Sequence, residues 1–298
     1  MSTLKAWILA SRLPSQSYIF FPLLLGQAIY YFQTSRFSIP NFFLLHLYGL
    51  FIQLFIVYAN DRADIETDRL NTTYNIFSGG SRTLVSGLIT EDENSFAIRI
   101  VIVGNAVVGL LFTILYQREL SLPLILLSLG LLWMYSFSPV RLSYRGGGEV
   151  LQMLGVGFVL PIFGFYGQSG SLEAFPLPVL AFILPCQMAC AIATSLPDEP
   201  SDRTSCKHTA AVVLGLSKAK LGVILLIALS FIMFLILSPA QLVHTATVLT
   251  LPVLCFIGML ILRTASPPGS RRLNLFVTFA VGANVSLMAG SALLFFYI

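Results

Sequence analysis

Long apolar runs separated by short polar segments dominate the chain from Tyr18 onward. Most are close to the ~20 residues that a helix needs to cross about 30 Å of hydrocarbon at about 1.5 Å per residue. None shows the strict alternation of a transmembrane β-strand. The pattern therefore predicts an all-α polytopic membrane protein with nine transmembrane helices, over residues 18–32, 42–59, 96–116, 120–137, 150–166, 178–196, 221–237, 241–262 and 273–297.

The composition supports a membrane location. Of 298 residues, 56% are hydrophobic and only 10% are charged, whereas soluble domains carry about 25% charge. So few charges would leave a large apolar surface in water. The same numbers exclude a disordered chain, and four cysteines are too few for a disulfide scaffold of this length. We expect an integral protein of a bacterial or archaeal cell membrane or, alternatively, of a thylakoid or other organelle membrane.

The charges gather on one side of the predicted bundle. If nine helices alternate in direction, that side holds all of the 17 cations except Arg36 and Arg118, and all of the 13 acidic residues except Glu119 and Glu173. The positive-inside rule makes this side cytoplasmic. The long segments 60–95 and 197–220 lie there too, and long loops in compact proteins are usually functional. We therefore expect the active site at the cytoplasmic-side boundary.

A polar cluster, residues 60–68, follows the second predicted helix. If the helix continues through it, Asn60, Asp64 and Asp68 are four residues apart and line one face. Like charges at this spacing repel each other, so a sequence that keeps them usually does so in order to bind a cation. Carboxylate and amide oxygens are hard ligands that suit Mg²⁺ or Ca²⁺. These three residues are therefore candidate metal ligands.

A second acidic cluster follows the sixth predicted helix. It repeats the D-x-x-x-D-R spacing of Asp64, Asp68 and Arg69 in the residues Asp198, Asp202 and Arg203. Two prolines in this segment make regular helix less favourable. The weak repeat predicts a single domain over residues 1–298, built from two related halves at about 1–140 and 141–298 that face each other across a pocket.

Two acidic clusters beside cations are typical of a metal-bridged diphosphate site, because Mg²⁺ is held by a few carboxylates together with phosphate oxygens. The candidate cations for the diphosphate are Arg82, Arg141, Arg145 and Lys207. Gly79 and Gly80 would let backbone amides approach an anion. The alternative role for Arg141 and Arg145 is topology signalling or lipid contact, and we expect Lys218 and Lys220 to be solvated.

Other kinds of site find no support in the sequence. His46, His208 and His244 lack the spacing of a zinc or haem site. No Walker-type or dinucleotide glycine motif occurs. We expect no nucleic-acid partner, and no protein partner is indicated.

The motifs together resemble the UbiA-type intramembrane aromatic prenyltransferases. Asn60-x-x-x-Asp64-x-x-x-Asp68 is similar to the first aspartate motif of that family, and the second is similar to Asp198-x-x-x-Asp202 with Lys207 and Thr209. Residues 135–149, from Tyr135 to Glu149, are similar to its third loop. Thr194 and Cys206 depart from the family pattern, which often has an amide at the first position and usually a glycine at the second. The resemblance covers nearly the whole chain and implies that the four aspartates are catalytic.

Within that family, residues 77–89 and 144–149 resemble the prenyltransferases of menaquinone and phylloquinone synthesis. The resemblance implies transfer of a polyprenyl group from an isoprenoid diphosphate to 1,4-dihydroxy-2-naphthoate, with Mg²⁺. Alternatives within the fold are 4-hydroxybenzoate, homogentisate or another acceptor, and a terpene cyclase. A membrane transporter is the alternative outside the enzyme class, but transporters usually place ionisable groups near the bilayer midplane.

The proposed chemistry assigns roles to charged and aromatic side chains. Metal and cations would stabilise the leaving diphosphate, and aromatic faces would stabilise an allylic cation by roughly 0.5–2 kcal/mol each. The aromatic candidates are Tyr58, Tyr135 and Tyr144, with Tyr74 near the same loops. The apolar tail of the substrate would remain in the lipid bilayer.

Overall fold

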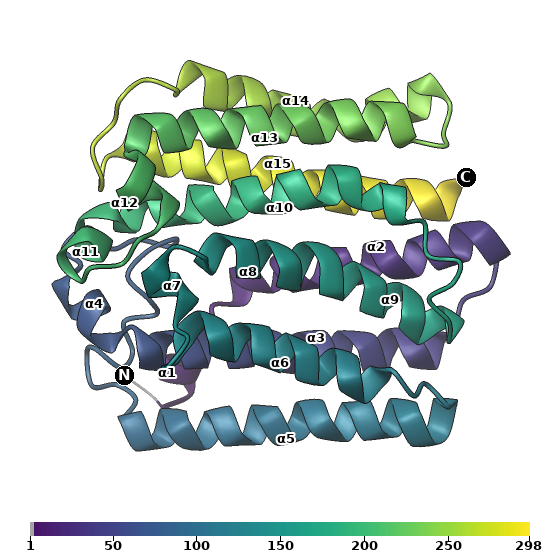
Figure 1. Cartoon of the computed structure of the whole chain (residues 1–298), viewed down its shortest axis with the longest axis horizontal. Helices are drawn as coiled ribbons and strands as arrows, with labels where there is room; N and C mark the ends of the chain where they lie inside the picture. Colours follow the sequence, from purple (N-terminus) through teal and green to yellow (C-terminus); the bar gives the residue numbers. More distant parts are fainter. Residues whose placement is uncertain (1–2) are drawn as a thin grey trace.

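The computed structural model describes residues 3–298, and every regular element in that range is helical. Figure 1 shows the long helices side by side in one bundle. Seven are long and apolar enough to cross a membrane. They are Ile39–Ala63 (α3), Glu91–Tyr116 (α5), Gly148–Ser169 (α8 and α9), Leu177–Thr204 (including α10 and α11), Leu216–Leu237 (α13), Leu242–Ile261 (α14) and Arg271–Tyr297 (α15). The prediction of an all-α membrane protein is confirmed.

The expected count of nine depends on two further helices. The first, α2 (Ser17–Thr34), has 18 residues but is less apolar, and the second, α6 (Ser121–Ser136), has only 16. Both pack inside the bundle, α2 against α3, α9 and α15, and α6 against α3 and α5. They are therefore part of the same bundle, although neither combines the length and the hydropathy of the other seven helices.

Glycines bring α2 (Ser17–Thr34) and α9 (Leu160–Ser169) into backbone contact. A Cβ atom on Gly26 would collide with the carbonyl oxygen of Pro161 and would lie 2.7 Å from the backbone nitrogen of Phe165. A Cβ atom on Gly164 would collide with the carbonyl oxygen of Leu23. Small residues allow membrane helices to approach this closely and to gain dispersion contacts. This pair of helices forms the centre of the bundle, between its two hydrophobic clusters.

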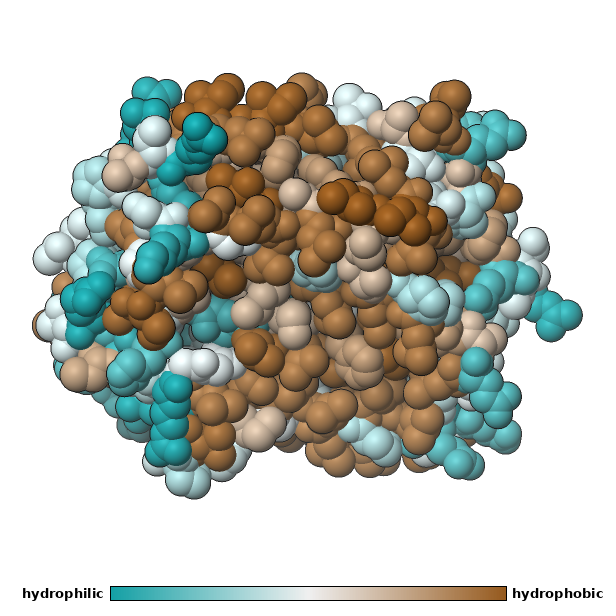
Figure 2. Space-filling model, turned by 45° about the horizontal axis from the view of Figure 1, so that its top comes forward, coloured by the Kyte–Doolittle hydropathy of each residue, from teal (hydrophilic) through white to brown (hydrophobic). Residues whose placement is uncertain are grey.

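The surface of the bundle matches a bilayer. Figure 2 shows a broad hydrophobic band between hydrophilic ends. Exposed apolar side chains on the long helices include Ile114 on α5, Leu225 on α13 and Val243 on α14. In water such a surface would be unfavourable, whereas in lipid it is the expected outer face of the helices.

The short helices gather at one end of the bundle. They are α1 (Thr3–Ala10), α4 (Ile65–Leu70), α7 (Leu142–Arg145), α11 (Glu199–Thr204) and α12 (Ala210–Leu214), and all lie on the left in Figure 1. The opposite end has tight connections, such as those between α5 and α6 and between α13 and α14. The expected asymmetry of the loops is confirmed, and the elaborated end carries both aspartate motifs.

Candidate functional site

The first aspartate motif lies where α3 ends. Asp64 has φ −105° and ψ 10°, which interrupts the helix, and α4 begins at the next residue. The helix is therefore not continuous through the motif, which was the condition under which Asn60, Asp64 and Asp68 were expected to line one face. The amide of Asp64 still donates to the carbonyl of Asn60 at 2.9 Å, and that of Asp68 donates to Asp64 at 2.8 Å. This keeps the three motif residues one turn apart, with Asn60 half-buried and both aspartates buried.

The second aspartate motif follows α10 through a short 3-10 turn, Leu196–Asp198. Pro197 and Pro200 each occupy the first positions of a helical segment, where a missing amide hydrogen costs little. Asp202 then lies on α11, which packs against α4. The two prolines therefore start short helices here rather than exclude helix, and the two motifs meet.

Two side chains connect the motifs directly. The ammonium of Lys207 lies 2.8 Å from Asp64 Oδ2 and 3.8 Å from Asp202 Oδ1. The amide nitrogen of Asn71 donates to Asp198 Oδ1 at 2.8 Å. Burial alone would lower the pKa of Lys207, but Asp64 and Asp202 outweigh it and raise that pKa. Lys207 is therefore a buried, charged bridge between the halves of the site.

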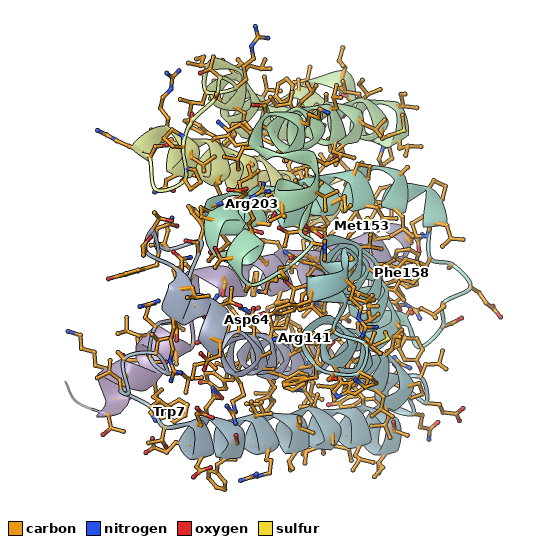
Figure 3. The ribbon with its side chains drawn as sticks, turned by 60° about the vertical axis from the view of Figure 1, so that its left-hand side comes forward. Trp7, Asp64, Arg141, Met153, Phe158 and Arg203 are labelled. Carbon is orange, nitrogen blue, oxygen red and sulfur yellow. The ribbon has the colours of Figure 1, made fainter. Side chains whose placement is uncertain are left out.

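Tyr144 holds the same end of α3 from the third loop. Its hydroxyl lies 2.8 Å from Thr67 Oγ1 and donates to Asp64 Oδ1 at 3.1 Å. The guanidinium of Arg141 is 3.5 Å from the centre of its ring, and the ammonium of Lys207 is 4.9 Å from it. Arg141 also donates to the carbonyl of Ala63 at 3.1 Å, and Figure 3 shows it beside Asp64. The ring of Tyr144 thus already contacts two cations of the protein.

The loop with Gly79 and Gly80 closes over the carboxylates. The amide of Gly79 donates to Asp198 Oδ1 at 3.0 Å. Gly80 has φ 68°, and a Cβ atom there would collide with Asp68 Oδ2 and lie 3.1 Å from Asp61 Oδ1. Only glycine allows this approach. The loop amides therefore serve the carboxylates of the protein itself, where we expected them to meet an external anion.

Negative charge in this carboxylate cluster (Asp61, Asp64, Asp68, Asp198 and Asp202) is only partly balanced. Asp61 pairs with Arg12 and accepts hydrogen bonds from Ser81. Asp68 and Asp198 form no ion pair with any residue of 3–298. Burial, together with the nearby Asp64 and Asp61, raises the pKa of Asp68 to about 7. A cation would relieve this repulsion.

The donor set suits a hard divalent metal. The cluster offers only oxygen ligands, which Mg²⁺ prefers, and it has carboxylate charge to spare. Within residues 3–298, however, no three Asp, Glu, His or Cys side chains are already arranged around a metal position. Lys207 occupies the space between Asp64 and Asp202. The oxygen ligands therefore suit Mg²⁺, and in this structure the ammonium of Lys207 lies between two of them, Asp64 and Asp202.

The remaining sequence-predicted residues differ in what their side chains contact. Arg82 contacts the carbonyl of Asp68 and lies 4.5 Å from the centre of the Tyr74 ring. Tyr135 lies against Gly148 at the start of α8. Tyr58 instead packs its ring on Trp7 of α1, with 5.6 Å between ring centres. Arg145 is exposed, and no described residue forms a hydrogen bond or ion pair with its side chain.

Sequence reasoning missed several residues of the site. Arg12, which is half-buried, forms an ion pair with the buried Asp61, and Asn71 and Thr67 hold Asp198 and Tyr144. A signal existed for two of them, because Asp61 lies inside the first motif and Arg12 is one of few cations near the N-terminus. Thr194, where relatives often have an amide, donates to carbonyls of its own helix.

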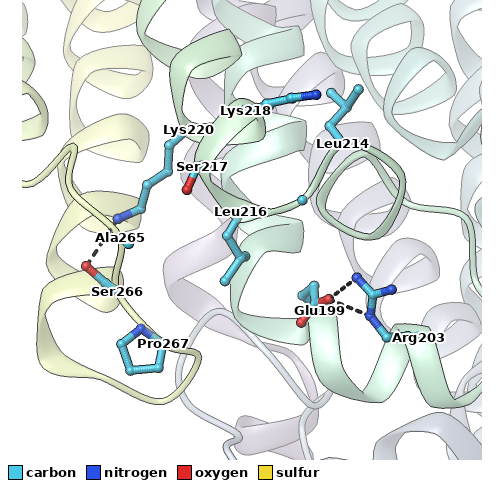
Figure 4. A pocket seen from close by; sticks show the side chains of 11 residues that line it. Glu199, Arg203, Leu214, Leu216, Ser217, Lys218, Lys220, Ala265, Ser266 and Pro267 are labelled. Carbon is cyan, nitrogen blue, oxygen red and sulfur yellow. Dashed lines mark hydrogen bonds and ion pairs between the residues drawn. The ribbon is translucent and has the colours of Figure 1, made fainter.

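A separate pocket of about 580 Å³ lies beside the cluster and includes none of its aspartates. Figure 4 shows its lining from α11, the start of α13 and the loop before α15. Lys220 lines it but is buried, and its ammonium donates to Leu262 O, Thr264 O and Ser266 Oγ at 3.0–3.3 Å. The expectation that Lys220 is solvated was wrong, because α13 begins at Leu216 and turns this residue toward the loop.

Membrane-crossing helices and two aspartate motifs that meet at one end of the bundle define an integral membrane protein with a cluster of carboxylates at one boundary. The chain belongs to the UbiA prenyltransferase family, whose model matches residues 19–295. It is therefore a prenyltransferase-class enzyme of a membrane. No curated protein matches it by sequence.

Solved structures share the fold across nearly the whole chain. The apo structure of a UbiA homolog from Aeropyrum pernix K1 has a TM-score of 0.68 and 15% identity, and covers 92% of this chain and 96% of that one. A UbiA homolog from Archaeoglobus fulgidus bound to GPP and Mg²⁺ has a TM-score of 0.64 and 16% identity, over 97% and 99%. A structure of a digeranylgeranylglyceryl phosphate synthase has a TM-score of 0.63 and 17% identity, over 100% of both chains. At these identities the similarity shows the fold alone.

Proposed function

We propose that this protein transfers a polyprenyl group from an isoprenoid diphosphate to an aromatic quinone precursor, with Mg²⁺, and that the acceptor is 1,4-dihydroxy-2-naphthoate. The observation that carries the proposal is the meeting of Asp64 and Asp68 with Asp198 and Asp202 at one end of the bundle. Support comes from the Archaeoglobus fulgidus homolog, which was solved with DMAPP and Mg²⁺ and with GPP and Mg²⁺.

In the proposed site the carboxylates bind the metal and the cationic side chains bind the diphosphate. Bound Mg²⁺ would supply the positive charge that stabilises the departing diphosphate. Its proposed ligands are Asn60, Asp64, Asp68, Asp198 and Asp202. Lys207, Arg82 and Arg141 would bind the diphosphate oxygens, and Arg145 would join them only if the loop moves. Cation-stabilising roles are proposed for Tyr58, Tyr135 and Tyr144, of which Tyr58 packs its ring on Trp7.

The proposed topology has nine crossings, with α2 and α6 added to the seven long helices. An odd number is supported by Figure 1, where α1 lies at the end with the aspartates and α15 finishes at the opposite end. The positive-inside rule places the aspartates at the cytoplasmic-side boundary. We further propose that the two aspartate motifs mark two related halves of one domain, about 1–140 and 141–298.

The apolar tail explains why such a site belongs in a membrane. Each isoprene unit has five carbons, so its burial contributes roughly 3–4 kcal/mol at about 0.8 kcal/mol per carbon. A long polyprenyl chain would therefore remain among the helices or in the bilayer. Its diphosphate would meet the charged end of the bundle. The acceptor assignment is supported by residues 77–89 and 144–149, which resemble the menaquinone and phylloquinone branch.

The test is a product assay with the full chain in detergent, labelled prenyl diphosphate, Mg²⁺ and a panel of acceptors. We expect labelled prenyl-naphthoate product, lost on addition of EDTA. Product only with 4-hydroxybenzoate or homogentisate would overturn the acceptor, and a labelled terpene without acceptor would indicate a cyclase. No product with any acceptor would overturn the proposed function.

Variants of acidic residues test the site itself. We expect Asp64→Asn to lower turnover by at least 1000-fold, because it removes a charged ligand and the partner of Lys207, a loss of about 4 kcal/mol. Glu66→Gln is the matched control, since Glu66 is exposed on α4 and pairs only with Arg69 among described residues. Equal activity of the two variants would contradict the shared-metal site.

A further inference from the structure

Lys207 lies between the two aspartate motifs and is held there firmly. Its residue is only 7% exposed. Its backbone amide donates to the carbonyl of Asp202 at 2.8 Å. The next residue, His208, contacts the carbonyl of Tyr144 through its backbone amide at 3.2 Å and its Nδ1 at 2.8 Å. Lys207 is therefore not a mobile surface lysine that happens to point inward.

The lysine uses the lone pairs that a metal would need. Asp64 receives Lys207 on Oδ2 and the hydroxyl of Tyr144 on Oδ1. Asp202 faces Lys207 with Oδ1 and receives the hydroxyl of Thr209 on Oδ2 at 3.2 Å. A Mg²⁺ ion requires oxygens at about 2.0–2.1 Å in a nearly octahedral arrangement. An ammonium between these carboxylates and a metal between them therefore exclude each other.

Within each motif, one carboxylate contacts a cation and the other does not. Asp64 and Asp202 share the single positive charge of Lys207, whereas Asp68 and Asp198 form no ion pair within residues 3–298. A bare divalent ion that took Asp64 and Asp202 would remove both carboxylates that the buried ammonium of Lys207 contacts. Breaking a buried pair in this way is strongly unfavourable. A diphosphate that arrives with the metal offers that ammonium a new anionic partner.

We propose that Lys207 is a built-in countercation that masks Asp64 and Asp202, so that the site accepts a metal–diphosphate complex but binds the bare metal only weakly. This inference rests on the proposed function and names the species that this same site binds. It makes Lys207 a residue that couples the binding of metal and diphosphate, in addition to its proposed contact with the diphosphate. The coupling is reciprocal, as any linkage between two ligands must be.

The test measures binding of Mn²⁺, which is used as a spectroscopic probe for Mg²⁺, to the full chain in detergent by electron paramagnetic resonance. We expect Lys207→Met to bind Mn²⁺ alone at least tenfold more tightly than the wild type. Lys218→Met is the matched control, because Lys218 is exposed and outside the cluster, and it should bind as the wild type does. Equal Mn²⁺ affinity in the wild type and a folded Lys207→Met would overturn the inference.

A second measurement needs only the wild type, in case Lys207→Met does not fold. Acetylation followed by mass spectrometry compares the modification rate of Lys207 with that of Lys218. We expect 1 mM Mn²⁺ alone to leave the ratio unchanged and to shift thermal unfolding little, whereas Mn²⁺ with inorganic pyrophosphate should stabilise the protein. Faster acetylation of Lys207 with Mn²⁺ alone would overturn the inference. Absence of stabilisation by Mn²⁺ with pyrophosphate would instead contradict the proposed function.

Discussion

Tyr144 shows how one side chain organises this site. Its hydroxyl contacts Thr67 and Asp64, while its ring lies under Arg141 and near Lys207. It thereby positions a carboxylate of the first motif from a loop about 80 residues further along the chain. Phenylalanine at this position would keep the ring and remove the hydroxyl, so the contributions of the two groups can be measured separately.

We expect Tyr144→Phe to lower kcat/KM by roughly 10- to 100-fold, since hydrogen bonds to charged groups contribute about 1.5–3 kcal/mol. The ring contacts with Arg141 and Lys207 should persist, so the fold should be retained. Prenyl transfer assays of both variants check this, with Tyr116→Phe as control, because Tyr116 ends α5 away from the site. Wild-type activity of Tyr144→Phe would show that the hydroxyl does not position Asp64.

Cys206 occupies a backbone conformation that favours glycine. Its φ is 57°, in the left-handed region that costs an L-residue roughly 1–2 kcal/mol. We expect Cys206→Gly to stabilise the protein by up to about 1 kcal/mol, once the greater flexibility of glycine in the unfolded chain is subtracted. Thermal unfolding in detergent measures the change. Ser205→Gly is the control, because Ser205 has φ −89° and should lose stability.

At the scale of helices, the close approach of α2 and α9 determines how the centre of the bundle packs. We expect Gly26→Ala to destabilise the protein by about 1–3 kcal/mol or more, because an added methyl group must push two backbones apart. Gly222→Ala is the matched control, since a Cβ atom there meets nothing within 4 Å. It should be neutral or stabilising by up to about 1 kcal/mol. Similar unfolding temperatures for the two variants would contradict this view of the interface.

Helices and motifs differ in how well the sequence predicts them. The apolar runs locate the long helices because composition alone decides which segments enter lipid. The start of α13 was missed by five residues, since Lys220 looks like a boundary charge until the carbonyls of Leu262 and Thr264 are placed beside it. The repeated aspartate spacing predicted that the motifs meet. The pairs Arg12–Asp61 and Asn71–Asp198 depend on tertiary contacts and left no comparable pattern.

For the whole molecule, the ends of the bundle differ in loops, charge and exposed thiols. Cys186 and Cys190 are buried and Cys255 is half-buried, whereas Cys206 is exposed at the end with the aspartates. We expect a membrane-impermeant maleimide to label Cys206 in inside-out vesicles and not in right-side-out vesicles or cells, because the proposed topology places that end on the cytoplasmic side. Cys206→Ser should abolish the label. Labelling from the outer side alone would reverse the proposed topology.

The ion pair between Arg12 and Asp61 has a practical consequence for handling the protein. Arg12 follows α1, whose Trp7 packs on Tyr58, so the segment 3–12 is held against the end of the molecule that carries the aspartates. Deleting the residues before Ser17 would remove Arg12 and leave Asp61 buried without its cation, and a bulky affinity tag there would lie beside this contact. Tyr297 at the end of α15 lies at the opposite end of the bundle. Purification handles and reporter fusions therefore belong at the C-terminus.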